Sequence, residues 1–224
     1  MDLALTINAW IDEEVIFAQQ IGAKQVIARI DARTETAVPV DALANRVTQA
    51  GLTLAGLYCE GARANAETKD WLEGLLRAAG GAKIGLMALA PALLPADWPT
   101  LAEAAAQSGV KLAIPSQKIP GGLKTKLPGP CVGLDVTPGR LLDGLEHAAP
   151  GTEARVFLVS FEREAQDGGG FEDLLRVCWR LRQAGYTGLI RIGAPSHWKG
   201  DTREGHRALA YTTGFLRAAL QTFK

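Results

Sequence analysis

Short apolar runs alternate with amphipathic helical runs along the whole chain, and this alternation limits the fold more than any other feature. Eight runs are apolar on both faces, as the strands of a buried parallel sheet must be. They cover residues 3–8, 25–30, 52–60, 83–89, 111–115, 131–136, 155–161 and 188–192. Helical patterns lie at residues 13–21, 40–50, 68–79, 101–107, 171–184 and 207–221. We therefore predict an α/β fold, a compact (β/α)8 TIM barrel whose first strand lies between the second and the eighth.

The length of the chain fits one such barrel. With 224 residues it is short for the fold but within its range, and 47% hydrophobic residues suffice for one large core. We predict a single domain over residues 1–224. The fifth connection is the exception to the alternation, because residues 116–122 are rich in helix breakers and predict a loop.

Charge and cysteine content bear on partners and location. The 24 Lys and Arg residues balance 24 Asp and Glu residues without a polybasic stretch, so neither nucleic acid nor a membrane surface is an expected partner. No apolar run could span a bilayer, and the first residues lack the basic segment of a signal peptide. The three cysteines, Cys59, Cys131 and Cys178, are far apart in sequence. We predict that they are reduced residues of the core. We expect a cytoplasmic protein, with a homodimer left open.

Polar residues recur where the predicted strands end, which is where TIM barrels place their sites. The candidates are Asn8, Arg29, Glu60, Asp135, Thr137, Ser160, Glu162, His197 and Lys199. Taken singly, each could be a solvated loop residue or an ion-paired one, and that alternative stays open. Taken together, carboxylates and cations at one end of successive strands predict a polar pocket for a hydroxylated or acidic small molecule.

Strand geometry ranks some of these candidates. Glu162 lies two residues after Ser160 and shares its face, so it should reach the rim of the barrel. Asp135 should lie one layer deeper than Thr137, where a carboxylate needs a partner. An arginine from the second or eighth strand could supply that partner. For Glu60, the structural alternative is an ion pair with Arg29 or Arg63.

Five segments are informative when they are taken in order. They are AEAAAQSGVKLAI (102–114), GLDVTPGRL (133–141), VFLVSFER (156–163), residues 171–188 and RALAYTTGFLRA (207–218). In the same order they resemble segments of mannonate dehydratases, a family of xylose isomerase-like barrels. The motifs are loose, and their shared order over most of the chain carries the resemblance. The resemblance implies a TIM barrel that acts on a sugar or sugar acid, with Glu60 at the position of the acid that ends the family's third strand.

The chain departs from this family at its metal site. The family binds a divalent metal through a His, a Cys, a second His and an Asp on strands five to eight, and the resemblance aligns these with Pro115, Thr137, Ser160 and Ile192. Proline and isoleucine cannot ligate a metal, and neutral hydroxyls replace imidazole and thiolate poorly. The same alignment turns Ile192 into the barrel and Arg191 outward. We expect no metal at this site and no other cofactor.

A different metal site stays open as a weaker alternative. Glu60, Asp135, Glu162 and His197 offer oxygen and nitrogen ligands that could suit magnesium or manganese, although no ligand spacing supports the set.

Two classes of function remain open. The first is a dehydratase, isomerase or epimerase of a sugar or sugar acid that works without a metal. Glu60, Glu162 or Asp135 would then supply acid and base chemistry, and Arg29 or Lys199 would hold the enolate charge. The second is a catalytically inactive barrel that binds a carbohydrate or a protein partner.

Overall fold

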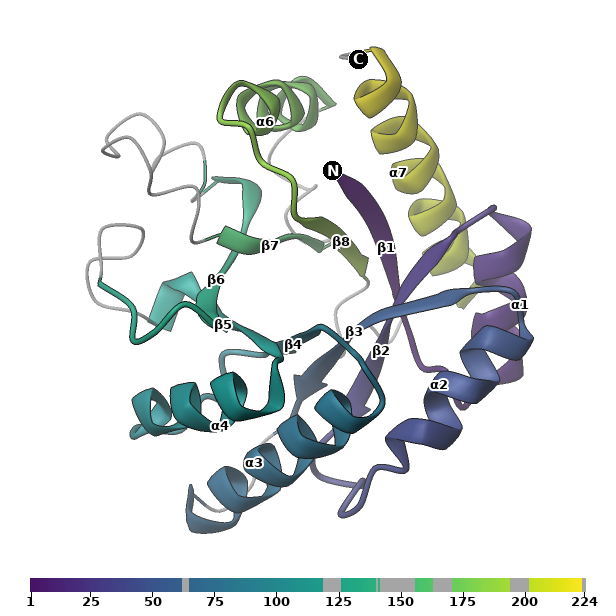
Figure 1. Cartoon of the computed structure of the whole chain (residues 1–224). Coiled ribbons are helices and arrows are strands. Elements are labelled where there is room, and N and C mark those ends of the chain that lie inside the picture. The colour runs from purple at the N-terminus through teal and green to yellow at the C-terminus, as the bar shows by residue number, and fades with distance from the viewer. Residues whose placement is uncertain are drawn as a thin grey trace.

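A closed barrel of eight parallel strands forms the centre of the molecule in the computed structural model, which describes residues 1–61, 65–118, 126–139, 141, 156–162, 171–193 and 202–222 (Figure 1). The strands are β1 (Asp2–Ile7), β2 (Gln25–Asp31), β3 (Thr53–Glu60), β4 (Leu86–Leu89), β5 (Lys111–Pro115), β6 (Val132–Val136), β7 (Val156–Glu162) and β8 (Leu189–Gly193). Each strand pairs with the next one in sequence, and β1 closes the ring by pairing with β8. The predicted (β/α)8 barrel is confirmed.

Helices lie outside this ring (Figure 1). They are α1 (Asp12–Gln20), α2 (Val40–Gln49), α3 (Asn65–Gly81), α4 (Leu101–Ser108), α6 (Phe171–Gln183) and α7 (Thr202–Thr222). The helix α2 shows why these segments pack against the strands, because Val40, Leu43 and Val47 recur at helical spacing and are all buried. The fifth connection begins with only a short 3-10 turn, Ser116–Lys118. Its residues 119–125 lie outside the described part.

Among the strands, the largest boundary error lies at the start of the fourth. The fourth strand begins at Leu86 rather than at Lys83. Lys83 has a positive φ of 59° and donates its backbone N–H to Gly80 O, so it belongs to the turn that ends α3. The apolar pattern alone could not separate this turn from the strand that follows it.

The strands separate two apolar layers. Between the strands and the helices, a large cluster contains residues such as Val26, Leu57 and Met87. Inside the barrel, a smaller cluster consists of Ala4, Ile27, Tyr58, Leu86, Ala88, Ala90, Ala113 and Leu158. Side chains of a strand alternate between the two faces of the sheet. The residues two positions after the members of this inner cluster therefore also point inward.

Several of these next inward positions are polar. They are Thr6, Arg29, Glu60, Asp135, Ser160 and Arg191, and together we call them the polar layer. The barrel therefore has an apolar filling towards the start of its strands and polar side chains towards their carboxyl ends.

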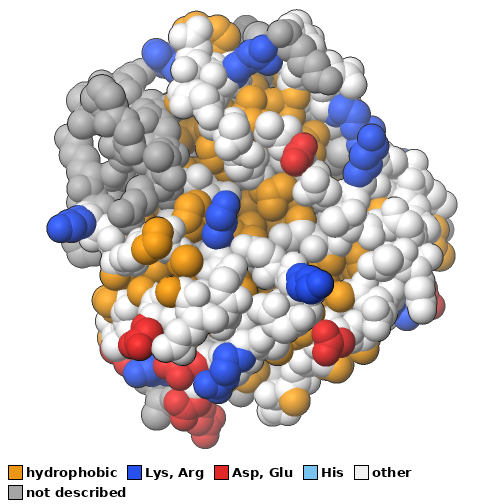
Figure 2. Space-filling model, in the orientation of Figure 1, with side chains coloured by type: hydrophobic (Ala, Val, Ile, Leu, Met, Phe, Trp, Pro, Cys, Tyr) orange, Lys and Arg blue, Asp and Glu red, His pale blue; other side chains and the backbone are white. Residues whose placement is uncertain are grey.

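Charged side chains of both signs lie scattered over the face shown in Figure 2, and apolar side chains lie near its centre. No single sign dominates this face, which agrees with the balanced composition of the chain. In the described ranges, no helix combines the length and the apolar character needed to cross a membrane.

The two ends of the chain are joined by one arginine. Arg217 of α7 donates to the carbonyl oxygen of Ile21 at 3.3 Å and to that of Gly22 at 3.0 Å. These carbonyls follow the last turn of α1, where helix geometry leaves acceptors without an intrahelical donor. Arg217 thus satisfies the end of the first helix from the last helix, and it lies beside a groove of about 510 Å³ where β1 begins.

Replacing Arg217 with methionine should remove these hydrogen bonds while keeping an unbranched side chain of similar length. We expect the free energy of unfolding to fall by about 0.5–1.5 kcal/mol, the usual net contribution of a hydrogen bond, because water can reach the Gly22 carbonyl oxygen. Urea unfolding measures this difference. Arg77→Met, at an exposed position of α3, is the control and should leave stability within about 0.5 kcal/mol of the wild type. Equal stability of the two variants would show that the Arg217 contacts contribute nothing.

Candidate functional site

The most buried charge of the polar layer is Arg191, whose residue is only 2% exposed. Its Nε donates to Ser160 Oγ at 2.8 Å, and Ser160 Oγ donates to Asp135 Oδ1 at 2.5 Å. The guanidinium carbon lies 3.9 Å from the centre of the Tyr58 ring. A buried cation needs this support, since removal from water costs several kcal/mol unless hydrogen bonds, opposite charge or an aromatic face compensate it.

The orientation of Arg191 corrects the prediction from the family resemblance. Leu189 packs against the inner apolar cluster, so alternation along β8 turns Arg191 inward as well. Ile192 instead joins the outer cluster between strands and helices. An alignment displaced by one residue exchanges the two faces of a strand, and that displacement explains the error.

The predicted arginine partner of Asp135 is found on the eighth strand. Ser160 joins the two, because its hydroxyl accepts from Arg191 and donates to Asp135. Asp135 and Ser160 are 9% and 3% exposed, so the whole chain of contacts is buried. Sequence reasoning identified Asp135 and Ser160 as candidates but left Arg191 out of the site, because the alignment turned it outward. The alternation from Leu189 was the signal that could have placed it inside.

Glu60 ends β3 on the inner face and is 8% exposed. Burial raises the pKa of its carboxyl, Arg29 opposes that shift, and Asp31 adds to it, while Arg33 and Arg191 oppose it. Burial is the largest of these effects, so the pKa of Glu60 lies above its usual range. A carboxyl group with a raised pKa can both accept and donate a proton closer to neutral pH.

Arg29 forms an ion pair with Glu14 of α1 and is not paired directly with Glu60. Its Nη2 lies 3.3 Å from Glu14 Oε1, and the other oxygen, Glu14 Oε2, accepts the backbone N–H of Asn8 at 2.6 Å. The Asn8 side chain accepts the backbone N–H of Trp10 at 3.1 Å. Asn8 and Arg29 therefore contact the segment that leads into α1, next to the barrel mouth.

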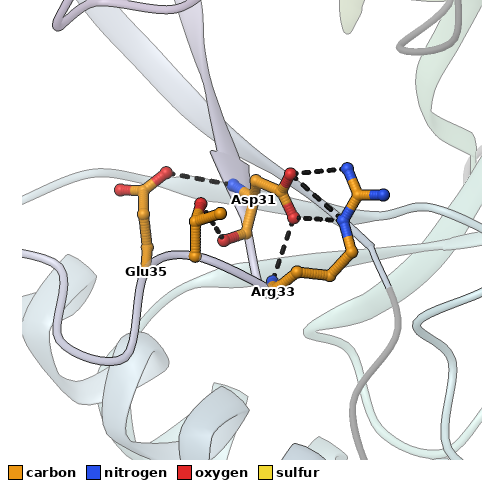
Figure 3. Close-up of polar contacts among 4 residues, drawn as sticks. Asp31, Arg33 and Glu35 are labelled. Atoms are coloured by element: carbon orange, nitrogen blue, oxygen red, sulfur yellow. Dashed lines mark hydrogen bonds and ion pairs between the residues drawn. The ribbon is translucent and has the colours of Figure 1, made fainter.

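A tight turn after β2 fixes the neighbouring carboxylate (Figure 3). Arg33 donates to Asp31 through its backbone N–H at 2.9 Å and through its guanidinium, with Nη2 at 2.6 Å from Oδ2. Asp31 in turn donates its backbone N–H to Glu35 Oε1 at 3.0 Å. The hydrogen bond from the Arg33 side chain is the main reason that the pKa of Asp31 is lowered.

Asp31 and Glu60 face each other across paired strands, since they are register partners of β2 and β3. Their pKa values shift in opposite directions, downward for Asp31 and upward for Glu60. Gly61 permits the close approach: its φ is +92°, and an added Cβ would lie 2.7 Å from Asp31 Oδ1. Environments that separate two titratable groups in this way are typical of acid and base pairs, with Asp31 staying ionised and Glu60 able to exchange a proton.

The remaining predicted residues are placed only in part. Thr137 follows β6 and is half-buried, with its carbonyl oxygen accepting the N–H of Leu141. Glu162 ends β7 as the register partner of Gly193, but its side chain lies outside the description. His197 and Lys199 lie outside the described residues. Their roles stay predictions.

The side chains present do not fit the metal site that the family resemblance implies. Pro115 and Ser160 lie at two of its positions, and the inward residue of β8 is Arg191, whose guanidinium has no lone pair to offer and would repel a cation. In the described ranges, no group of three or more His, Cys, Asp or Glu side chains could hold a metal ion. The weaker oxygen-ligand alternative involves Glu162 and His197, so it stays untested.

Comparisons with known proteins agree with the fold. No family model matches the chain, and no curated protein is significantly similar to it in sequence. Among solved structures, it is similar to D-psicose 3-epimerase from Clostridium cellulolyticum H10 in complex with D-tagatose. That match has a TM-score of 0.73 and 14% identity over 98% of this chain and 99% of the epimerase.

Two further structures share the architecture. A sugar phosphate isomerase/epimerase from Parabacteroides distasonis matches with a TM-score of 0.64 and 11% identity over 95% of this chain and 96% of that one. A xylose isomerase-like TIM barrel/4-hydroxyphenylpyruvate dioxygenase fusion protein matches with a TM-score of 0.66 and 13% identity over 100% of this chain and 43% of the fusion. At these identities the likeness shows the fold alone, a TIM barrel. The resemblance to mannonate dehydratases stays a prediction.

The Arg191 guanidinium also makes the metal prediction testable. We expect the purified protein to carry no stoichiometric transition metal, because a second cation beside a buried arginine would be repelled. Elemental analysis and melting curves with and without EDTA measure this, and the melting temperature should not change. One tightly bound manganese or zinc ion per chain, lost together with stability in EDTA, would contradict the expectation.

Proposed function

We propose that the barrel binds a sugar or a sugar acid at its carboxyl-end mouth and acts on it as an isomerase or epimerase through carboxylate acid and base chemistry, without a metal. The observation that carries the proposal is the pair of buried opposite charges, Glu60 and Arg191, on the inner face of the barrel. The sugar epimerases and isomerases among the structural neighbours support the choice of substrate class.

The two side chains match the two needs of such a reaction. A C–H bond next to a carbonyl group breaks when a base takes the proton, and the electron pair moves onto the carbonyl oxygen as an enolate. Glu60 takes the proton, and a cation such as Arg191 stabilises the negative oxygen. Return of the proton to the other face of the same carbon inverts its configuration. In an isomerisation the proton returns instead to the former carbonyl carbon, while the proton of the neighbouring hydroxyl group passes to the enolate oxygen and that hydroxyl oxygen becomes the new carbonyl oxygen. Neither route needs an oxidant or reductant.

Glu162 is the second candidate for proton transfer in this scheme. It is the last residue of β7, two positions after Ser160, and we assign it to the same mouth on the alternation expected of a strand. An epimerase that exchanges protons on both faces of one carbon needs two such groups. A dehydratase would use one of them to protonate a leaving hydroxyl group instead.

The raised pKa of Glu60 fixes the sign of its effect on stability. The folded protein holds the Glu60 proton to higher pH than the unfolded chain does, so the contribution of Glu60 to stability is present at low pH. It is lost as the pH rises from the unfolded pKa through the folded pKa. Above its folded pKa, the ionised Glu60 is thus a cost to folding.

Glu60→Gln tests the proposal. The amide keeps the shape of the side chain and removes the charge, so we expect the melting temperature at pH 7 to stay the same or rise, with the difference shrinking near pH 4. Turnover should fall at least about 100-fold, as is usual for loss of a general base. Substrates are sought by thermal shift among neutral sugars, aldonic acids and sugar phosphates, because a ligand that binds only the folded state raises the melting temperature.

Glu103→Gln is the matched control, since Glu103 is an exposed carboxylate of α4 away from the mouth. It should change neither stability nor turnover. A Glu60→Gln protein that keeps full ligand affinity and activity would remove Glu60 from the site. Ligand binding without turnover in the wild type would instead favour an inactive, carbohydrate-binding barrel.

A further inference from the structure

One buried hydroxyl of the polar layer has no partner. In the part of the chain that the structure describes, the buried side-chain oxygens without a hydrogen bond are Thr6 Oγ1 and Ser108 Oγ. A buried polar atom left unsatisfied costs about 1–3 kcal/mol, so each case calls for a reason. Thr6 belongs to the inner face of β1, two residues after the inward Ala4.

The Thr6 hydroxyl lies beside the Arg191 guanidinium. A Cβ atom placed on Gly193 would lie 3.3 Å from Thr6 Oγ1 and 3.2 Å from Arg191 Nη1, so the two groups flank the same point at the end of β8. Gly193 is the register partner of Glu162, which places this point at the level of the last residue of β7. Gly193 has no side chain, so none projects from β8 at this point.

The guanidinium is held in place from its other side. Its Nε is fixed by Ser160 and its face lies on Tyr58, so its position does not depend on a ligand. Arginine can only donate hydrogen bonds, and a threonine hydroxyl can donate one as well. A group that contacts both must therefore be an acceptor, and a negatively charged oxygen gains most beside a buried cation.

We propose that Thr6 Oγ1 and the Arg191 guanidinium form an oxyanion subsite inside the barrel, which binds the carboxylate of a sugar acid. The subsite rests on the proposed function in that the rest of the ligand is a polyol bound at the mouth. It narrows the substrate class from sugars in general to hydroxy acids, and it gives a ligand-binding role to a residue of β1, far in sequence from Ser160 and Arg191.

The test uses Thr6→Val, which keeps the shape of the side chain and removes the hydroxyl. Because the hydroxyl has no partner in the protein, the melting temperature without ligand should stay the same or rise. The affinity for D-gluconate, measured by titration calorimetry, should fall about 10-fold to 100-fold, the loss expected for one hydrogen bond to a charged group. Thr6→Ser, which restores a hydroxyl, should recover most of this affinity.

Two matched controls make the result specific. D-glucitol is a polyol like D-gluconate but has no carboxylate, so it should bind the wild type at least about 10-fold more weakly than D-gluconate does. Its affinity for Thr6→Val should equal its affinity for the wild type. Ser108→Ala removes the other unpaired hydroxyl, at the end of α4, and should leave gluconate affinity unchanged.

Three outcomes overturn the inference. A Thr6→Val protein that loses stability but keeps full gluconate affinity would make the hydroxyl a structural group. Equal binding of gluconate and glucitol by the wild type would remove the oxyanion subsite and leave the proposed function standing. Failure of gluconate, glucitol and D-fructose all to bind would overturn the subsite and the proposed function together.

Discussion

A guanidinium group buried inside a closed barrel is the constraint on which the arrangement of the mouth depends. Arg191 cannot give up its proton, so the protein must compensate its charge where it stands. Tyr58 offers an aromatic face, Ser160 an acceptor oxygen, and Asp135 a carboxylate one hydrogen bond further on. The three come from β3, β7 and β6, so a single charge determines inward side chains on three other strands.

The two carboxyl groups Asp31 and Glu60, at the ends of β2 and β3, have pKa values shifted in opposite directions. Asp31 is held by Arg33 and stays ionised, whereas Glu60 is buried and its pKa is raised. The two pKa shifts differ because of position. Asp31 lies at a turn that supplies several hydrogen-bond donors, whereas Glu60 is the last residue of β3 and lies on the inner face of the barrel. Two acids of similar intrinsic strength, facing each other on paired strands, can then serve different purposes.

Periodicity in the sequence was enough to predict the barrel, its strand order and several inward residues. Eight doubly apolar runs leave few alternatives. The inner position of Ser160 agrees with the family resemblance, which aligns it with a metal ligand. The face of β8 was missed, because Arg191 and Ile192 are adjacent and a one-residue displacement in a loose alignment exchanges them. The ion pair between Arg29 and Glu14 could not be predicted either, since it depends on how α1 packs beside the mouth.

The division between the apolar filling and the polar layer explains how such a mouth can change without loss of the fold. Ala4, Ile27 and Leu158 fill the barrel one step below Thr6, Arg29 and Ser160, so the packing that closes the ring does not pass through the polar side chains. The polar layer can therefore hold a positive charge that belongs to the chain itself, the Arg191 guanidinium. Such a group adds the cost of burying its charge to the folding free energy, but it stays in position before any ligand arrives, and preorganised charge is what a developing oxyanion needs. The unpaired Thr6 hydroxyl beside it is consistent with this view, because a polar atom kept without a partner in the folded protein is satisfied only when something else binds.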